Sequence, residues 1–368
     1  MRPRPPISSD AKTLSARYYT DPVLFERERD VFFRRMWSCV ARVEELPARG
    51  SFVTREIAGD RMVILRTEET GFRALSNVCR HRGTQLCAEA EGSLNGSIQC
   101  PYHAWTYDYD GRLLGAPHME GTSGFRKEDY SLGSMAVDSW AGFVFVRPAE
   151  HGQSLRQQLA DLPDKFAPWR LDDLRRAHRI VYDIAANWKL IIQNYSECLH
   201  CPNLHPQLNR LSHYLSGEND PLHSSYMGGR MDLGDGFETM STSGRSVCEA
   251  LPGLAGDDRR RVYYYAIFPN LLLSAHPDYA MTHTLWPVSP DRTRLVCEWL
   301  FHPGAIARPG FDPGDVLSFW DQTNRQDWFV CEQAQIGIGS RGYVPGPYSN
   351  REELLHAFDR YVVEKLDM

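Results

Sequence analysis

The arrangement of apolar and polar positions divides the chain into a short helical start, a β-rich stretch and a mixed second half. Asp21 followed by Pro22 is a typical helix start, and apolar residues then recur near helical spacing over residues 23–37. Between about residues 50 and 148, short apolar runs alternate with Gly- and Asn-containing turns, which predicts β-strands. An Asp-Gly pair at 110–111 predicts a hairpin within this stretch.

The second half contains longer segments of both kinds. Residues 263–275, 279–288 and 292–303 are rich in aromatic and aliphatic residues and are predicted to form successive strands of one sheet. Apolar residues at spacings of three and four predict one long helix over residues 315–336. The segment 215–258 is rich in Gly, Ser, Asp and Met, and we expect a mobile loop or lid there.

The composition restricts the class of protein. A length of 368 residues suits two domains, and 42% hydrophobic with 24% charged residues is ordinary for a globular protein. A net charge of −6 argues against a nucleic-acid partner, and no apolar run approaches the roughly 20 residues that span a membrane. The polar N-terminus lacks a secretory signal, and nine irregularly spaced cysteines cannot all be paired. We therefore expect a cytoplasmic protein whose thiols bind metal or pack in the core.

Four metal-binding side chains lie in two short segments of the β-rich stretch. Cys79 and His81 form the first pair, and Cys100 and His103 form the second. Zinc also accepts two thiolates and two imidazoles, but zinc fingers usually pair cysteine with cysteine and histidine with histidine. One cysteine and one histidine from each segment suit a two-iron cluster with thiolates on one iron and imidazoles on the other. Cys87 lies outside this spacing, and we interpret it as a small packed residue.

A second group of ligands is predicted in residues 187–208. Glu197 and His200 are three positions apart, which places them on one face of a predicted helix. Pro202 is then expected to break the helix, and His205 can approach the same point from a loop. Two histidines with one carboxylate form the facial triad of non-haem iron oxygenases, which leaves positions open for O₂ and substrate.

The third ligand of this triad is predicted on the long helix of residues 315–336. One largely apolar face of this helix contains Val316, Trp320, Thr323, Asp327, Val330 and Ala334. An aspartate on such a face is costly unless it is paired or bound to metal. We therefore select Asp327 as the third ligand.

The complete pattern resembles the catalytic α-subunit of Rieske non-haem iron oxygenases over most of the chain. The segments NYSECLHC, NRQDW and SRGY are most similar to the carnitine and glycine betaine branch of the aromatic-ring-hydroxylating dioxygenase family. The resemblance implies an α+β protein in which residues 46–150 form an all-β Rieske [2Fe-2S] domain. Residues 151–368 would form a catalytic domain that holds a mononuclear Fe(2+) and has an antiparallel sheet lined by helices, in a helix-grip (START-like) arrangement. Residues 1–45 would be a helical segment packed on the catalytic domain.

The same resemblance assigns Glu197 as a bridging carboxylate rather than a ligand. It would connect His103 of one subunit to His200 of a neighbour, which implies a homotrimer in which electrons cross between subunits. Metal-bound histidines commonly give their second N–H to a carboxylate, so the role has a physical basis. The GIGSRG segment at 337–342 follows a helix instead of a strand, so it fails the context of a dinucleotide-binding motif. A separate NAD(P)H-dependent flavin and iron–sulfur reductase must then supply the electrons.

The implied reaction is the O₂-dependent hydroxylation of a C–H bond in a small substrate. On a carbon attached to nitrogen the product is a hemiaminal whose C–N bond breaks, and we favour this oxidative N-dealkylation of an amine or quaternary ammonium compound. On an aromatic ring the same site would give a phenol or a cis-diol by mono- or dioxygenation. A stand-alone Rieske electron carrier is the alternative from another class. It predicts two irons per chain, whereas the oxygenase predicts three irons and two acid-labile sulfides.

Aromatic residues supply the candidates for substrate binding. A cation–π pocket around a quaternary ammonium group would be formed by Tyr195, Tyr263, Tyr265 and Trp286, with Tyr264 and Phe237 as further candidates. Alternatively, these aromatic residues belong to the core. His276, His283 and His302 are interpreted as core or surface histidines rather than ligands. The Cys198-x-x-Cys201 pair invites a zinc or redox interpretation, but a thioredoxin-like site requires a βαβ context that this region lacks.

Overall fold

The chain folds into two compact units. The computed structural model describes residues 7–8, 10–68 and 71–367. The smaller unit comprises residues 32–158, and the larger unit combines residues 1–31 with residues 159–368. No helix in the described ranges is long and apolar enough to cross a membrane.

The first boundary between the units differs from the predicted one. Residues 1–45 are predicted to form one helical segment, but strand β1 (Ser38–Arg42) pairs antiparallel with β10 (Phe143–Arg147) in the smaller unit. All five residues of β1 are buried, so burial in a sheet outweighs continuation of the helical pattern. The predicted helix start is confirmed, since the Asp21 side chain accepts a hydrogen bond from the first turn of α2 (Pro22–Glu28).

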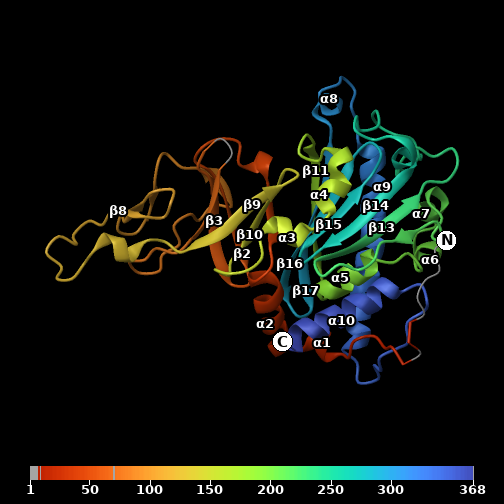
Figure 1. The fold of residues 1–368 in the computed structure, drawn as a ribbon, viewed down its shortest axis with the longest axis horizontal. Helices are drawn as coiled ribbons and strands as arrows, with labels where there is room; N and C mark the ends of the chain where they lie inside the picture. The colour runs from red at the N-terminus through yellow and green to blue at the C-terminus, as the bar shows by residue number, and fades with distance from the viewer. Residues whose placement is uncertain (1–6, 9, 69–70, 368) are drawn as a thin grey trace. The chain divides into compact units, whose positions relative to one another are not determined.

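The smaller unit is built from antiparallel strands in two sheets (Figure 1). The strand order is β1-β10-β9-β4-β3-β2-β5 in the seven-stranded sheet and β6-β7-β8 in the three-stranded sheet. Besides β1 and β10, the strands are β2 (Ser51–Ile57), β3 (Asp60–Arg66), β4 (Phe72–Ser76), β5 (Glu91–Ser93), β6 (Ile98–Gln99), β7 (Thr106–Tyr107), β8 (Leu113–Gly115) and β9 (Ser134–Trp140). The short helical segments up to residue 159 are α1 (Arg17–Thr20), η1 (Arg29–Arg34), η2 (Val43–Glu45), η3 (Lys127–Tyr130) and α3 (Leu155–Leu159). The all-β architecture predicted for this unit is confirmed.

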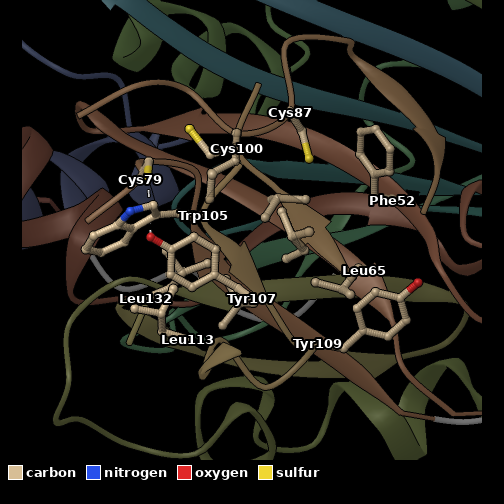
Figure 2. Close-up of a cluster of buried hydrophobic side chains, with 14 residues drawn as sticks. Phe52, Leu65, Cys79, Cys87, Cys100, Trp105, Tyr107, Tyr109, Leu113 and Leu132 are labelled. Atoms are coloured by element: carbon tan, nitrogen blue, oxygen red, sulfur yellow. Dashed lines mark hydrogen bonds between the residues drawn. The ribbon is translucent and has the colours of Figure 1, made fainter. Parts of the chain in front are cut away.

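The core of the smaller unit includes both cysteines of the predicted cluster site (Figure 2). The predicted hairpin is formed by β7 and β8, and Gly111 in its turn has a φ of 86°, a left-handed conformation that favours glycine. Tyr107 of this hairpin is fully buried, and its Oη lies 3.3 Å from Cys79 Sγ. The hairpin therefore holds the first cysteine in place.

The larger unit contains one seven-stranded antiparallel sheet with helices packed on it (Figure 1). The strand order is β11-β17-β16-β15-β14-β13-β12. The strands are β11 (Arg175–Ile184), β12 (Glu218–Asn219), β13 (Tyr226–Asp232), β14 (Arg261–Ile267), β15 (Leu271–Ala275), β16 (Ala280–Ser289) and β17 (Arg292–Phe301). The further helical segments are α4 (Leu162–Phe166), η4 (Ala167–Trp169), α5 (Trp188–Tyr195), α6 (Cys201–Leu204), α7 (Pro206–Leu211), η5 (Gly256–Arg260), α8 (Pro303–Ile306), α9 (Gly314–Ile338) and α10 (Glu353–Asp367). This arrangement confirms the predicted antiparallel sheet lined by helices.

The long helix α9 confirms the predicted helix. In its C-terminal half, however, the buried face consists of other residues than those predicted. Val330 and Ala334 are only half-buried. The buried positions of this half are Trp328, Cys331, Gln335 and Ile338. Of these, Cys331 packs on α5, since its Sγ lies 3.7 Å from the carbonyl oxygen of Leu190. Asp327 therefore lies at the edge of the buried face, with 15% of its side chain exposed.

The segment 215–258 is packed against the sheet, which corrects the expectation of a mobile loop. It contributes strand β13 to the sheet, and Met240 within it is fully buried. A Cβ on Gly228 would lie 2.3 Å from the carbonyl oxygen of Tyr264, so this glycine permits the close approach of β13 to β14. Gly228 thus serves close packing of two strands.

A buried ion pair joins the N-terminal helix α2 to α5 inside the larger unit. Lys189 Nζ lies 2.5 Å from Glu28 Oε1, and the two side chains are 0% and 1% exposed. The indole N–H of Trp188 donates to the other carboxylate oxygen of Glu28 at 2.7 Å. Burial lowers the pKa of Lys189, and the Glu28 carboxylate opposes that effect. This contact anchors the helix that leads into the second predicted metal site.

Candidate metal centres and the adjoining cavity

Two turns of similar shape carry the first set of candidate ligands. The backbone N–H of Gly83 donates to the carbonyl oxygen of Cys79 at 3.0 Å, and that of Ala104 donates to Cys100 at 3.1 Å. Gly83 and Ala104 both have positive φ values, 74° and 58°, which turn the chain back on itself. Each turn therefore presents one cysteine together with one histidine.

The two turns bring all four candidate ligands of the smaller unit together. The rings of His81 and His103 are 4.7 Å apart, and His81 stacks on Trp105. Cys79 and Cys100 are buried free thiols. Both histidine Nδ1 atoms are buried and have no hydrogen-bond partner among the described residues, which is costly unless a metal occupies them. Burial also lowers the pKa of His103, which favours the neutral ligand form. This donor set fits a [2Fe-2S] cluster with two thiolates and two imidazoles.

Cys87 takes no part in this group. It is buried in the same core as Cys79 and Cys100 (Figure 2), and burial raises the pKa of its thiol to about 11. Its backbone N–H donates to the Asn77 side chain at 2.8 Å. These contacts agree with the interpretation of Cys87 as a packed residue.

The second candidate site lies in a turn, which corrects the prediction of a continuous helix. Helix α5 ends at Tyr195, and Ser196 at its C-cap has left helical geometry while its hydroxyl donates to the carbonyl oxygen of Ile192. Pro202 lies in the first turn of the new helix α6, where proline is favoured, and so it begins a helix instead of ending one. Glu197 is nevertheless adjacent to His200, since its Oε1 contacts His200 Nδ1.

The turn and helix α9 bring two histidines and one carboxylate to a common point. Candidate ligand atoms of His200, His205 and Asp327 all lie within 4.8 Å of one another. Asp327 Oδ1 is 2.8 Å from His205 Nε2 and 3.4 Å from His200 Nε2. Both histidines are held through Nδ1, His200 by Glu197 and His205 by Gln326 at 2.8 Å. Partners on Nδ1 leave each Nε2 directed at the shared point, which fits the facial triad that binds a mononuclear iron.

The charges of this site favour a bound cation. Burial alone would raise the pKa of Asp327, but the hydrogen bonds to His200 and His205 outweigh it and hold the pKa below its ordinary value. Burial likewise would lower the pKa of His200, but Asp327 and Glu197 raise it to about 10. Two carboxylates, Glu197 and Asp327, thus bring negative charge next to the two histidines. A bound metal ion would supply the positive charge that balances it.

A cavity of about 130 Å³ opens beside the triad. His200, His205, Asp327 and Glu197 lie in its wall. The rest of the wall combines apolar and aromatic residues with polar ones. The former include Tyr195, Leu208, Met231, Tyr264, Met281, Trp320 and Trp328, and the latter include Asn194, Arg230, Asn324 and Arg351. A cavity of this kind beside a metal site is suited to a small substrate that carries both apolar and polar or charged groups.

The structure separates the aromatic candidates into two groups. Tyr195 and Tyr264 line the cavity, whereas Phe237, Tyr263, Tyr265 and Trp286 do not. Alternation along β14 places Tyr263 and Tyr265 on the opposite face of the sheet from Tyr264, where their rings pack against Trp169 and Phe166. Alternation along β16 likewise turns Trp286 away from the face that carries Met281. The prediction for Tyr263, Tyr265 and Trp286 is therefore corrected.

His283 is a cavity residue that sequence reasoning missed. It lies two positions beyond Met281 on the same face of β16 and lines the cavity, although it is only 2% exposed. Side chains alternate between the two faces of a strand, so His283 could have been identified from Met281 once the strand register was known. The other two histidines agree with the prediction, since His276 is fully buried in the core and His302 caps helix α8.

Cys198 and Cys201 form a disulfide that brackets His200. The remaining seven cysteines are free, and six of these are buried. Cys198 lies in the turn after α5 and Cys201 begins α6, so the pair is not flanked by a βαβ unit and a thioredoxin-like site is not supported.

The fold and the two donor sets define a two-centre iron protein that activates O₂. Residues 36–129 match the family model of the Rieske [2Fe-2S] domain, and residues 171–368 match that of the ring hydroxylating alpha subunit (catalytic domain). The chain belongs to the Rieske non-haem iron oxygenase family, as a member of the ring-hydroxylating α-subunits, and both cofactors of that family have fitting donor sets here. The prediction of family, enzyme class and cofactors is thereby confirmed.

Relatives and solved structures agree with this assignment. The chain is 38% identical over 346 residues to a carnitine monooxygenase oxygenase subunit of Escherichia coli (strain K12), covering 91% of this chain and 86% of the relative. It is 31% identical over 366 residues to a glycine betaine monooxygenase oxygenase subunit of Pseudomonas aeruginosa (strain UCBPP-PA14), covering 91% and 84%. A solved quaternary ammonium Rieske monooxygenase matches with a TM-score of 0.82 and 25% identity, covering 97% and 96% of the two chains. Naphthalene 1,2-dioxygenase from Rhodococcus sp. shares the fold with a TM-score of 0.76 at 20% identity, covering 95% and 94%.

Proposed function

We propose that this chain hydroxylates a carbon next to the nitrogen of a small quaternary ammonium compound, after which the C–N bond breaks. The observation that carries this proposal is the wall of the cavity. The aromatic rings of Tyr195, Tyr264 and Trp328 line it together with the carboxylates of Glu197 and Asp327. An ammonium group without N–H donors binds through aromatic faces and nearby negative charge rather than through hydrogen bonds. The similarity to carnitine and glycine betaine monooxygenases supports the same substrate class.

The reaction balances with a separate source of electrons. One O₂, two electrons and two protons convert a C–H bond to C–OH and release one water. The mononuclear iron, when bound, supplies the activation of O₂. The hydroxylated carbon then releases the amine and becomes an aldehyde, which needs no further oxidant. The GIGSRG segment at 337–342 lacks the strand-before-helix context of a dinucleotide site, and the relatives are oxygenase subunits, so in this proposal a separate NAD(P)H-dependent reductase supplies the electrons.

Each candidate ligand has a defined task in this proposal. Two Cys–His pairs hold the cluster in the smaller unit, and His200, His205 and Asp327 hold the iron. Glu197 holds His200 through Nδ1 and would connect it to His103 of a neighbouring subunit. That link requires a ring of subunits, for which we propose a homotrimer in the cytoplasm. A solved relative is described with inter-subunit electron transfer, which supports such a path.

Metal analysis and product analysis test the proposal together. We expect three irons and two acid-labile sulfides per chain after anaerobic reconstitution. With a reductase and NADH, carnitine, glycine betaine or choline should yield an amine and an aldehyde in proportion to the O₂ consumed. Benzoate and other simple aromatic acids serve as the matched comparison. Hydroxylated product from aromatic acids alone would overturn the substrate class, and two irons per chain would indicate an electron carrier.

A further inference from the structure

Two buried nitrogen atoms in the cavity wall have no partner among the described residues. They are Nδ1 of His283 and Nε1 of Trp328. The two side chains are 2% and 6% exposed, and both line the cavity. Their ring centroids are 5.8 Å apart and the ring planes are nearly perpendicular, so the two side chains belong to one part of the wall. The Tyr264 hydroxyl, which both donates and accepts, is a third buried polar atom of this wall without a partner among the described residues. Buried polar atoms are nearly always satisfied, so these two atoms are available to a polar group that enters the cavity.

The chemistry of these two nitrogens is complementary. His283 Nε2 lies 3.2 Å from the side-chain oxygen of Asn324, and an amide oxygen only accepts. Nε2 therefore carries the ring proton, which leaves Nδ1 as an acceptor. The indole Nε1–H of Trp328 only donates. Burial lowers the pKa of His283 to about 4, so that the ring is neutral at ordinary pH. The patch thus offers one acceptor and one donor side by side.

Among the groups of a small quaternary ammonium substrate, only one matches this pair. The ammonium group has no N–H to donate to His283. A carboxylate only accepts hydrogen bonds, so it could not bond to the lone pair of His283 Nδ1. A hydroxyl group both donates and accepts. We propose that His283 and Trp328 form a subsite for a hydroxyl group of the substrate, beside the metal triad. This inference rests on the proposed function. Within that substrate class, the subsite would favour quaternary ammonium compounds that carry a hydroxyl group.

The position of the subsite relates the hydroxyl group to the reacting carbon. Trp328 directly follows the triad residue Asp327 on α9, and both line the cavity. The negative charge of Asp327 also acts on the His283 ring. The hydroxyl group would therefore lie on a carbon near the one that is oxidised. Because a substrate that lacks it leaves both nitrogens unsatisfied, we expect a loss of affinity of about tenfold or more.

A pair of ligands that differ in one hydroxyl group tests this inference. L-Carnitine carries the group and γ-butyrobetaine lacks it, and both are bound by a solved relative. Dissociation constants are measured by calorimetry on the reconstituted holoenzyme, anaerobically and without reductase, so that no turnover occurs. We expect the native chain to bind L-carnitine about tenfold or more tightly than γ-butyrobetaine.

Three substitutions separate a hydroxyl subsite from a merely structural role. His283→Leu removes the acceptor and should make the two dissociation constants equal, mainly by weakening L-carnitine. His283→Asn restores a polar atom near the Nδ1 position and should recover part of the difference. Trp286→Phe, on the opposite face of β16, is the matched control and should retain the full difference. Iron content and circular dichroism of each variant verify that it is folded and loaded.

The possible outcomes are distinguishable from failure of the proposed function. If the native chain binds both ligands equally, the subsite is refuted while the proposed function stands. An equal loss of affinity for both ligands in His283→Leu would assign that residue a structural role and refute the subsite as well. If neither ligand binds but an aromatic acid does, the proposed function itself fails.

Discussion

The buried carboxyl group of Asp278 should make the stability of this protein fall as the pH rises. Asp278 is fully buried between β15 and β16, and its Oδ2 has no partner among the described side chains. Its Oδ1 accepts a hydrogen bond from Thr239 at 2.6 Å. Burial raises the pKa of Asp278 from 3.8 to about 7, because the hydrogen bond only partly replaces water.

The size of the effect follows from the two pKa values. A group whose folded-state pKa is raised binds more protons in the folded state, so its contribution to stability is complete below pH 3.8 and is lost as the pH rises through about 7. The whole difference corresponds to about 4 kcal/mol at 1.36 kcal/mol per tenfold change in proton affinity. Between pH 5 and pH 8 we expect a loss of about 2.5 kcal/mol from this group alone.

Comparison with Asp278→Asn isolates this contribution. The amide does not titrate, so relative to the native chain the variant should gain about 2.5 kcal/mol in free energy of unfolding between pH 5 and pH 8. Urea unfolding followed by tryptophan fluorescence at pH 5, 6, 7 and 8 measures it. Asp235→Asn, at a fully exposed position, is the control and should follow the native chain at every pH. Parallel stability curves for the native chain and Asp278→Asn would refute the reasoning.

Three further predictions concern the anchor, the triad and the sheet. Glu28→Gln leaves the charge of Lys189 buried without its counter-charge, and urea unfolding should show a loss of about 3–5 kcal/mol; a loss below 1 kcal/mol would contradict a fully buried pair. Asp327→Ala removes the third donor of the triad, so iron analysis should fall from three to two per chain with both sulfides retained; unchanged iron content would exclude Asp327 as a ligand. Gly228→Ala would place a Cβ 2.3 Å from the carbonyl oxygen of Tyr264, so we expect little folded protein; normal yield and thermal stability would show that β13 yields without cost.

Residue type and short-range spacing were sufficient to predict both donor sets. Cys79 with His81, and Cys100 with His103, are close in sequence, so the turns that present them are local. The choice of Asp327 depended only on a charged residue on an apolar helix face, which is costly wherever that face is buried. The overall fold class followed from strand-like and helical patterns of long, regular segments.

Long-range contacts decided the features that the sequence left open. The turn at Glu197 depends on where α5 stops, and periodicity does not show that the helix ends at Tyr195. Tyr264 faces the cavity because of its register with β15 and β16. The run of three tyrosines does not itself show which of them points to that face of the sheet. The role of His283 depends on Asn324, 41 positions away in sequence. Such pairings arise only when distant elements meet.

The ion pair between α2 and α5 has a consequence for dissecting this protein into parts. The catalytic half is not a continuous stretch of sequence, because Glu28 lies before the smaller unit and Lys189 after it. A fragment that starts at residue 159 would keep the iron ligands but lose Glu28, the counter-charge of Lys189. The helix carrying Lys189 ends just before Glu197, so such a truncation would loosen the support of His200 itself. Separate expression of the oxygen-activating half would therefore require sequence from both sides of the smaller unit.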